Sequence, residues 1–587
     1  MSFPTVAPAM PDTVTAAIAA IDWTDKHYLI VDDFVGIRQL LRESLRNLGA
    51  KHIDQAASGG EAMIMLAKTH YDVVLCDFNL GEGKNGQQVL EEVRIRNLMT
   101  PSSVWLMVSA EKSVESVMGA AEHQPDAYII KPITEGVLLT RLNRVWQKKQ
   151  IFREIDQAFV EKDYLRAARL CDEQIVHNKL HEIDLLRMKA QLLLKAGEPE
   201  KARVVYDLVL EERDYNWART GLAKIRMSNG DHEAARQMFQ GVIAENRFYI
   251  DAYDQLATAY QLMGKVEESC DVLEKAAKLS PNSVPRQRNL GNAALKLGNI
   301  PLAERAFRKC IAIGEYSVLK TVDAYFGLAR VCGQKNDPKE ALQVLATAQR
   351  EFSGDQVALR AKITEGLVYH ESGDYRRARK SGDELETMLN EDPERPDTDT
   401  CIEMATLLFA VGVKDAPVEL LCYVIRNNHD NQLLLEDVQK IFDKARMSEE
   451  GADLIQASRK EAAHDEQGRA AVENRQAGRG GGVDAHRARR AAEQYAHPVQ
   501  FGADTDLAHA AERLHPGADG RGQRRADARG PHRPRPAALR AADRAAGHAD
   551  AVAPCRGGGR SRHRNRNPAG GGRRVVEYSS TCFPALQ

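Results

Sequence analysis

The sequence predicts a multidomain protein with a doubly wound α/β sheet of five parallel strands, then an all-α solenoid, then a disordered C-terminal tail. Three observations along the 587 residues predict this order. Five short apolar runs alternate with helix-like stretches, a unit of 33 or 34 residues recurs further on, and the composition changes abruptly near residue 460. The expected parts are a disordered lead at 1–25, the α/β domain at 26–148, the solenoid at 149–457 and the tail at 458–587.

The five apolar runs have the character of buried parallel strands. Each is short and followed by a stretch with helical spacing of its apolar residues, and all but the second are rich in β-branched or aromatic residues. The helix after the first run ends near Gly49, which is suited to a helix C-terminus. The runs are HYLIV (27–31), IDQAA (53–57), YDVVLCD (71–77), VWLMVSA (104–110) and AYIIKP (127–132).

Polar side chains stand where four of these strands end. Asp32 and Asp33 follow the first run, Asp77 closes the third, and Ser109 and Lys131 stand at the fourth and fifth. The carboxyl ends of parallel strands meet at one edge of a sheet, so these groups should share a crevice. Three converging carboxylates favour a hard divalent cation such as Mg²⁺. A carboxylate beside a metal, a hydroxyl and a lysine is well placed to attack phosphorus.

The motifs LIVDDF, LCDFN, VSA and IIKP, in this order, resemble the receiver domain of two-component response regulators. The single-domain chemotaxis regulators have the most similar pattern, and the resemblance covers about 120 residues. It implies that Asp77 accepts a phosphoryl group. It also implies that Asp33 binds Mg²⁺ directly, that Asp32 acts through water, and that the backbone carbonyl of Asn79 is a further ligand.

The same resemblance assigns the groups around the phosphoryl group. Lys131 pairs with it, and the bond between Lys131 and Pro132 is expected to be cis. Ser109 senses the phosphoryl oxygen, and Tyr128 is the aromatic side chain that rotates on activation. This sequence departs from many receivers at Leu80 and Gly81, where Met-Pro is common, and the following loop is one residue longer.

From residue 150 a repeated pattern joins a glycine, a small residue five positions later and a large residue four positions after that. The pattern resembles the tetratricopeptide repeat, and about eight copies would form a superhelix with a concave binding face. The segment DAYDQLATAY (251–260) fits the first helix of that motif. We expect the packing residues of the array to be Ala202, Tyr206, Ala235, Phe239, Tyr253, Leu256, Tyr260, Ala303 and Phe307.

The net charge of −2 is an average over unlike parts. From residue 461 there are 22 Arg, no Lys and 14 acidic residues, which gives +8 and leaves −10 for residues 1–460. A stretch of Arg, Ala and Gly buries little apolar surface and is expected to be disordered. It is interpreted either as an Arg-rich arm that binds RNA or acidic partners, or as the product of a reading-frame shift. We favour the frame shift, because the change is abrupt and falls just after a helix-like segment.

Together these patterns predict a cytoplasmic response regulator without catalytic activity of its own beyond loss of its phosphoryl group. Its expected partners are a sensor histidine kinase or phosphotransfer protein and an unidentified protein ligand of the repeat array, with Mg²⁺ as cofactor. Neither DNA binding nor a membrane span is expected. Three alternatives remain: a constitutive scaffold whose receiver only docks, a nucleic-acid-binding regulator that uses the tail, and an array that mainly dimerises the protein.

Overall fold

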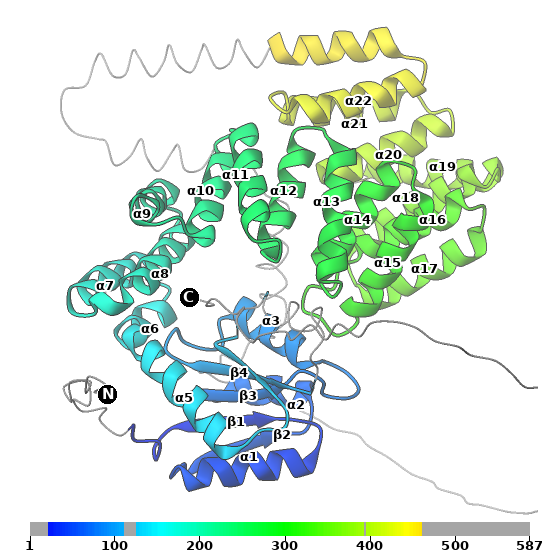
Figure 1. Ribbon diagram of the computed structural model, residues 1–587. Helices are drawn as coiled ribbons and strands as arrows, with labels where there is room; N and C mark the ends of the chain where they lie inside the picture. Colours follow the sequence, from blue (N-terminus) through cyan, green and yellow to red (C-terminus); the bar gives the residue numbers. More distant parts are fainter. Residues whose placement is uncertain (1–20, 111–121, 123–124, 392–394, 461–587) are drawn as a thin grey trace, which may run out of the picture. The chain divides into compact units, whose positions relative to one another are not determined.

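The computed structural model describes residues 21–110, 122, 125–391 and 395–460. Most of the predicted disordered lead and the predicted tail from residue 461 onward lie outside the described residues. Figure 1 shows an α/β domain in blue, followed along the chain by paired helices coloured from cyan to yellow. Among the described residues, no helix has both the length and the apolar character needed to cross a membrane.

The predicted parallel sheet is confirmed, with strand order β2-β1-β3-β4-β5. All four neighbouring pairs are parallel. The third strand is shorter than the apolar run around it, since it begins at Val73, and the hydroxyl of the preceding Tyr71 donates to Asp54 at 2.8 Å. The strands are β1 His27–Val31, β2 His52–Ala56, β3 Val73–Asp77, β4 Val104–Ser109 and β5 Ala127–Ile130.

Helices cover both faces of this sheet, which explains why its central strands are apolar on both faces. Alternate residues of β1 enter different cores: Leu29 and Val31 pack with α2 and α3, whereas Tyr28 and Ile30 pack with α1 and α5. The α/β domain is therefore doubly wound, as the sequence predicts. Its helices are α1 Val35–Asn47, α2 Gly59–Lys68, α3 Gly86–Arg96 and α5 Glu135–Lys149.

The first half of the helical array begins directly after α5. A short 3-10 turn, η1 (Gln150–Phe152), leads into helices that pack mainly against their neighbours in the chain. A second such turn, η2 (Lys179–His181), separates α7 from α8. The helices are α6 Arg153–Val160, α7 Tyr164–His177, α8 Glu182–Lys195, α9 Pro199–Glu212, α10 Asn216–Ser228, α11 His232–Glu245, α12 Ile250–Leu262 and α13 Val266–Leu279.

The second half of the array continues the same alternation of paired helices. A final helix at 448–460 follows α22. The helices are α14 Val284–Lys296, α15 Ile300–Gly314, α16 Asp323–Gln334, α17 Pro338–Glu351, α18 Asp355–Glu371, α19 Tyr375–Glu391, α20 Thr398–Ala410, α21 Asp415–Asn427 and α22 Gln432–Lys444.

The repeated glycines mark the turns inside the helix pairs. Gly197, Gly230, Gly264 and Gly298 have φ of +73°, +84°, +72° and +71°. A residue with a side chain is disfavoured in this left-handed region, so glycine is suited to the tight turn after the first helix of each pair. The nearly equal spacing of these glycines in the sequence therefore corresponds to nearly equal lengths of the helices between them.

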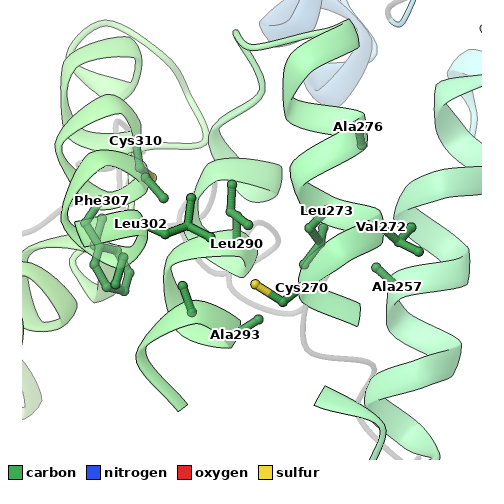
Figure 2. Close-up of a cluster of buried hydrophobic side chains, with 14 of the residues drawn as sticks. Ala257, Cys270, Val272, Leu273, Ala276, Leu290, Ala293, Leu302, Phe307 and Cys310 are labelled. Atoms are coloured by element: carbon green, nitrogen blue, oxygen red, sulfur yellow. The ribbon is translucent and has the colours of Figure 1, made fainter. Parts of the chain in front are cut away.

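The array core is built where the second helix of one pair meets first helices on both sides. Phe307 of α15 is fully buried, and a Cβ added at Gly291 of α14 or at Gly327 of α16 would lie 2.6 Å or 2.3 Å from its ring. Figure 2 shows Phe307 and Leu302 of α15 with Leu290 of α14 in this core. The nine residues expected to pack the array are all buried: Ala202, Tyr206, Ala235, Phe239, Tyr253, Leu256, Tyr260, Ala303 and Phe307.

Candidate functional site

The strand order places the ends of β1 and β3 side by side at the centre of the sheet, and the acidic residues stand there. Asp32 and Asp33 follow β1, and Asp77 is the last residue of β3. One carboxylate oxygen from each of the three lies within 4.8 Å of the others. This is the point of an open α/β sheet where connections leave in opposite directions, and crevices form there.

Lys131 lies beyond β5 and joins two of these carboxylates. Its Nζ donates to Asp32 Oδ2 and to Asp77 Oδ2, each at 2.8 Å. Asp32 is 1% exposed and Asp77 is 7% exposed, so both carboxylates are largely removed from water. The ammonium group is thus a built-in counter-ion for the buried pair.

The electrostatics of Asp77 and Lys131 follow from this burial. Burial raises the pKa of the Asp77 carboxyl above its ordinary value, and Asp32 adds to the rise, while the hydrogen bond from Lys131 opposes it. Burial alone would lower the pKa of Lys131, but its hydrogen bonds to Asp32 and Asp77 raise the pKa above the ordinary value. The lysine is therefore held as a cation within hydrogen-bond distance of the Asp77 carboxylate.

The charge of the cluster fits a divalent cation. Three carboxylates and one ammonium group leave an excess of negative charge, and the acid oxygens converge from two neighbouring strand ends. Oxygen ligands of this kind are those that Mg²⁺ prefers, with water and phosphate oxygens completing its shell. Asp32, Asp33 and Asp77 are thus the residues whose chemistry and placement suit a Mg²⁺ ion.

Arg38 is a member of this site that the sequence analysis missed. It lies in the first turns of α1, and its Nη1 donates to the backbone carbonyl of Asp32 at 2.6 Å and to that of Asp33 at 3.1 Å. Asp32 Oδ1 also accepts from the backbone N–H of Phe34 at 2.9 Å. An arginine on an amphipathic helix has no distinctive sequence signal, because only the folded chain brings it to the strand end.

The remaining predicted residues surround the three carboxylates. Ser109 is buried at the end of β4, and its carbonyl accepts from the backbone N–H of Lys131 at 2.8 Å. The peptide bond between Lys131 and Pro132 is cis. Tyr128 is half-buried on β5 and packs against the core formed by α2 and α3. Asn79 is exposed, two residues beyond Asp77.

The loop between β3 and α3 explains the departure at Leu80 and Gly81. Leu80 is buried, and Gly81 has φ of +70°. Proline fixes φ near −65°, so the proline common in many receivers is incompatible with this loop conformation. Asn85 then caps the start of α3 with a capping box. Its side-chain oxygen accepts from the backbone N–H of Gln88, and the side-chain oxygen of Gln88 accepts from the backbone N–H of Asn85. The extra loop residue is thus accommodated before the helix starts.

Comparison with known proteins agrees with this geometry. The family model of the response regulator receiver domain matches residues 28–143, which contain all the strand ends described above. Chemotaxis protein CheY-3 of Vibrio cholerae serotype O1 is 33% identical over 120 residues, which are 20% of this chain and 91% of that protein. Through this domain the chain belongs to the response regulator receiver family. Chemotaxis protein CheY of Pseudomonas aeruginosa is 32% identical over 120 residues and is covered to 95%.

The receiver occupies only the first part of the chain. The tetratricopeptide repeat model matches residues 250–283, which hold α12 and α13. This match confirms the nature of the repeat predicted from DAYDQLATAY. The chain therefore combines a module of two-component signalling with helical repeats of a class that binds other proteins.

Proposed function

We propose that the protein is a response regulator in which Asp77 accepts a phosphoryl group and the repeat array is the protein-binding output. The observation that carries the proposal is the arrangement around Asp77, where Lys131 Nζ lies 2.8 Å from its carboxylate and two further acids converge on it. The donor is a sensor histidine kinase or a phosphotransfer protein. The receiver acts as an acceptor and not as an enzyme with a separate substrate.

The transfer is an in-line displacement at phosphorus. An Asp77 carboxylate oxygen forms a bond to phosphorus while the bond from phosphorus to the donor imidazole nitrogen breaks, and the electron pair stays on that nitrogen. The product is an acyl phosphate on Asp77. Negative charge on the phosphoryl oxygens is stabilised by the Lys131 ammonium group and by the hydroxyl of Ser109.

A Mg²⁺ ion fits this reaction as cofactor. Asp32, Asp33 and Asp77, with the backbone carbonyl of Asn79, are the proposed protein ligands, and Asp32 acts through water. The bound ion would neutralise phosphoryl oxygens. Lys131 would stabilise the phosphoryl oxygens together with the ion, because its Nζ already donates to both Asp32 and Asp77.

The phosphoryl group is proposed to act as a switch on the output. Ser109 and Tyr128 move towards it, which alters the face formed by β4, β5 and the adjoining helix. That change regulates which proteins the array binds. A cytoplasmic location is part of the proposal, since the seven cysteines described all have free thiols, as expected in a reducing compartment.

Labelling with a small phosphodonor tests the acceptor role. The full chain is incubated with Mg²⁺ and radiolabelled acetyl phosphate, and Asp77→Asn is the matched variant. We expect label on the wild type that depends on Mg²⁺ and is lost in Asp77→Asn. An unlabelled wild type, or equal labelling of both proteins, would support the rival view of a constitutive scaffold whose receiver only docks.

Hydrogen exchange tests the coupling to the array. The full chain is compared with and without beryllofluoride, a mimic of the phosphoryl group, and Asp77→Asn is measured in parallel. We expect altered exchange in helices of the array for the wild type alone. Unchanged exchange throughout the array, with clear protection around Asp77, would overturn the proposed switch while leaving the acceptor role intact.

A further inference from the structure

Asp33 differs from the other two carboxylates of the cluster. It is exposed, whereas Asp32 and Asp77 are buried and accept hydrogen bonds from Lys131. An exposed acid side chain samples several rotamers unless its surroundings restrict it. A cation at this site would need the Asp33 oxygen in one place, so the residues that restrict Asp33 matter for the geometry of the site.

Arg38 restricts the backbone beneath Asp33. Its Nη1 bridges the carbonyls of Asp32 and Asp33, at 2.6 Å and 3.1 Å. One guanidinium nitrogen between two successive carbonyls fixes the orientation of both peptide groups, because a charged donor makes a strong and directional hydrogen bond. The Cα–Cβ direction of Asp33 is thereby set, and only its side-chain torsions remain free.

Gly81 leaves room for the Asp33 carboxylate on the side of the loop between β3 and α3. A Cβ built on Gly81 would lie 3.3 Å from Asp33 Oδ2, which is closer than a comfortable contact. The absence of a side chain at residue 81 therefore leaves the volume in which the Asp33 carboxylate lies. The positive φ of Gly81 aims the missing Cβ at Asp33, so this contact depends on the conformation that distinguishes the loop.

The loop that carries Gly81 is held in place by contacts at its far end. The backbone N–H of Gly86 donates to the carbonyl of Phe78 at 2.9 Å, and Lys84 forms an ion pair with the largely buried Glu92. The start of α2 also lies close against the loop, since a Cβ on Gly59 would lie 2.2 Å from the carbonyl oxygen of Lys84. A side chain added at residue 81 would accordingly displace the exposed Asp33 carboxylate and not the loop.

We propose that Arg38 and Gly81 are positioning residues for Asp33, Arg38 by orienting its backbone and Gly81 by leaving its carboxylate unobstructed, and that together they give the site its preference for Mg²⁺ over Ca²⁺. Mg²⁺ requires near-ideal octahedral geometry at about 2.0–2.1 Å, while Ca²⁺ accepts longer and less regular contacts at about 2.3–2.6 Å. A small displacement of one carboxylate is therefore more harmful to Mg²⁺ than to Ca²⁺. This inference rests on the proposed function, in which the three acids hold Mg²⁺.

Calorimetric titration of the full chain with MgCl₂ and with CaCl₂ tests the role of Gly81. Gly81→Ala is compared with Gly83→Ala, which is a matched control because Gly83 has φ of +95° and an added Cβ there would meet nothing within 4 Å. Both variants carry a backbone penalty, but only Gly81→Ala crowds Asp33. We expect Gly81→Ala to weaken Mg²⁺ binding by about tenfold, with a smaller change for Ca²⁺, and Gly83→Ala to match the wild type.

A second pair of variants tests Arg38 independently. Arg38→Met removes the bridge to the two carbonyls, and Arg46→Met removes an exposed arginine from the last turn of the same helix. We expect Arg38→Met to weaken Mg²⁺ binding by about tenfold, and Arg46→Met to leave it unchanged. Thermal unfolding of all four variants in EDTA shows whether each is folded.

The outcomes separate this inference from the proposed function. A wild type that binds no Mg²⁺ would overturn the proposed function. A wild type that binds Mg²⁺, with Gly81→Ala equal to Gly83→Ala or with equal losses for Mg²⁺ and Ca²⁺, would overturn the positioning role of Gly81. An unaltered Mg²⁺ affinity in folded Arg38→Met would overturn the role of Arg38.

Discussion

At the scale of single residues, Lys131 offsets the repulsion between the two buried carboxylates at the strand ends. Asp32 and Asp77 are buried acids from neighbouring strands, and without a cation they would repel each other at high energetic cost. The ammonium group of Lys131 bonds to both at 2.8 Å. The same contact brings the lysine to the carboxylate that we propose attacks phosphorus, so stability and chemistry depend on one side chain.

Replacing Lys131 with methionine should make the receiver depend on metal for stability. The variant leaves two buried carboxylates without their counter-ion, which costs about 3–5 kcal/mol. A divalent cation can replace the lost charge, so Mg²⁺ should raise the unfolding midpoint of Lys131→Met more than that of the wild type. Thermal unfolding in EDTA and in excess MgCl₂ measures this difference.

Lys51→Met is the control for that measurement. Lys51 pairs with Asp25 at 4.0 Å on the surface, where an ion pair contributes about 0–1 kcal/mol. We expect the same response to Mg²⁺ in Lys51→Met as in the wild type. If Lys131→Met were as stable as the wild type in EDTA, the counter-ion role of Lys131 would be wrong.

At the scale of elements, helices of the array approach closely wherever a glycine faces a large side chain. Gly327 of α16 lies against the ring of Phe307 of α15, and an added Cβ there would be 2.3 Å from it. Gly327→Ala should therefore destabilise the array by about 1–3 kcal/mol through overpacking. Urea unfolding followed by circular dichroism measures the change.

The opposite effect on stability, a gain, is expected for a glycine in an open part of the array. Gly241 lies inside α11, and an added Cβ would meet only the end of Arg219 at 3.6 Å. Gly241→Ala should stabilise the array by about 0.5–1 kcal/mol, because alanine is the better helix former. Stabilisation of similar size in both variants would mean that helix propensity and not close packing governs Gly327.

Ion pairs join first helices of neighbouring repeats. Asp323 of α16 accepts from Arg360 of α18 at 2.8 Å and lies 3.8 Å from Arg288 of α14. Burial alone would raise the pKa of Asp323, but the two arginines outweigh it and lower the pKa below its ordinary value. These contacts connect helices of successive repeats.

The lowered pKa of Asp323 gives its contribution a definite pH dependence. A carboxyl whose pKa is lower in the folded state stabilises the fold above the unfolded pKa, and this stabilisation disappears as the pH falls through the folded pKa. Asp323→Asn should therefore cost about 1–2 kcal/mol at pH 7, with a difference that shrinks only below about pH 4. Urea unfolding of both proteins at pH 7, 4 and 3 checks this. A gap that is constant across the range would exclude the ionic contribution.

At the scale of the whole molecule, every residue of the proposed site lies before residue 149, and the repeat helices described lie before residue 461. The segment after residue 460 differs from both in charge, with 22 Arg among its residues and no Lys. We expect a chain ending at Lys460 to be labelled at Asp77 as well as the full chain is. Labelling with acetyl phosphate and Mg²⁺ compares the two.

The same truncation addresses the nucleic-acid alternative. Binding of a fluorescent single-stranded RNA is measured with both chains at two salt concentrations, since contacts with phosphates weaken as salt rises. We expect weak binding that is the same for both. Salt-dependent binding by the full chain alone would favour an Arg-rich arm, and sequencing the gene across codon 461 would then exclude or reveal a frame shift.

The sequence by itself determined the sheet, the strand-end chemistry and the repeat period. Those features are local: apolar runs mark the strands, acids close β1 and β3, and glycines recur at equal spacing. Only the tertiary structure decided which residues orient Asp33 and leave room for its carboxylate, and which glycines meet Phe307. Arg38 reaches the strand end because α1 folds back along the sheet, and Gly81 faces Asp33 because its φ is positive. Such contacts depend on helix placement and backbone torsion, which no short pattern of residue types encodes.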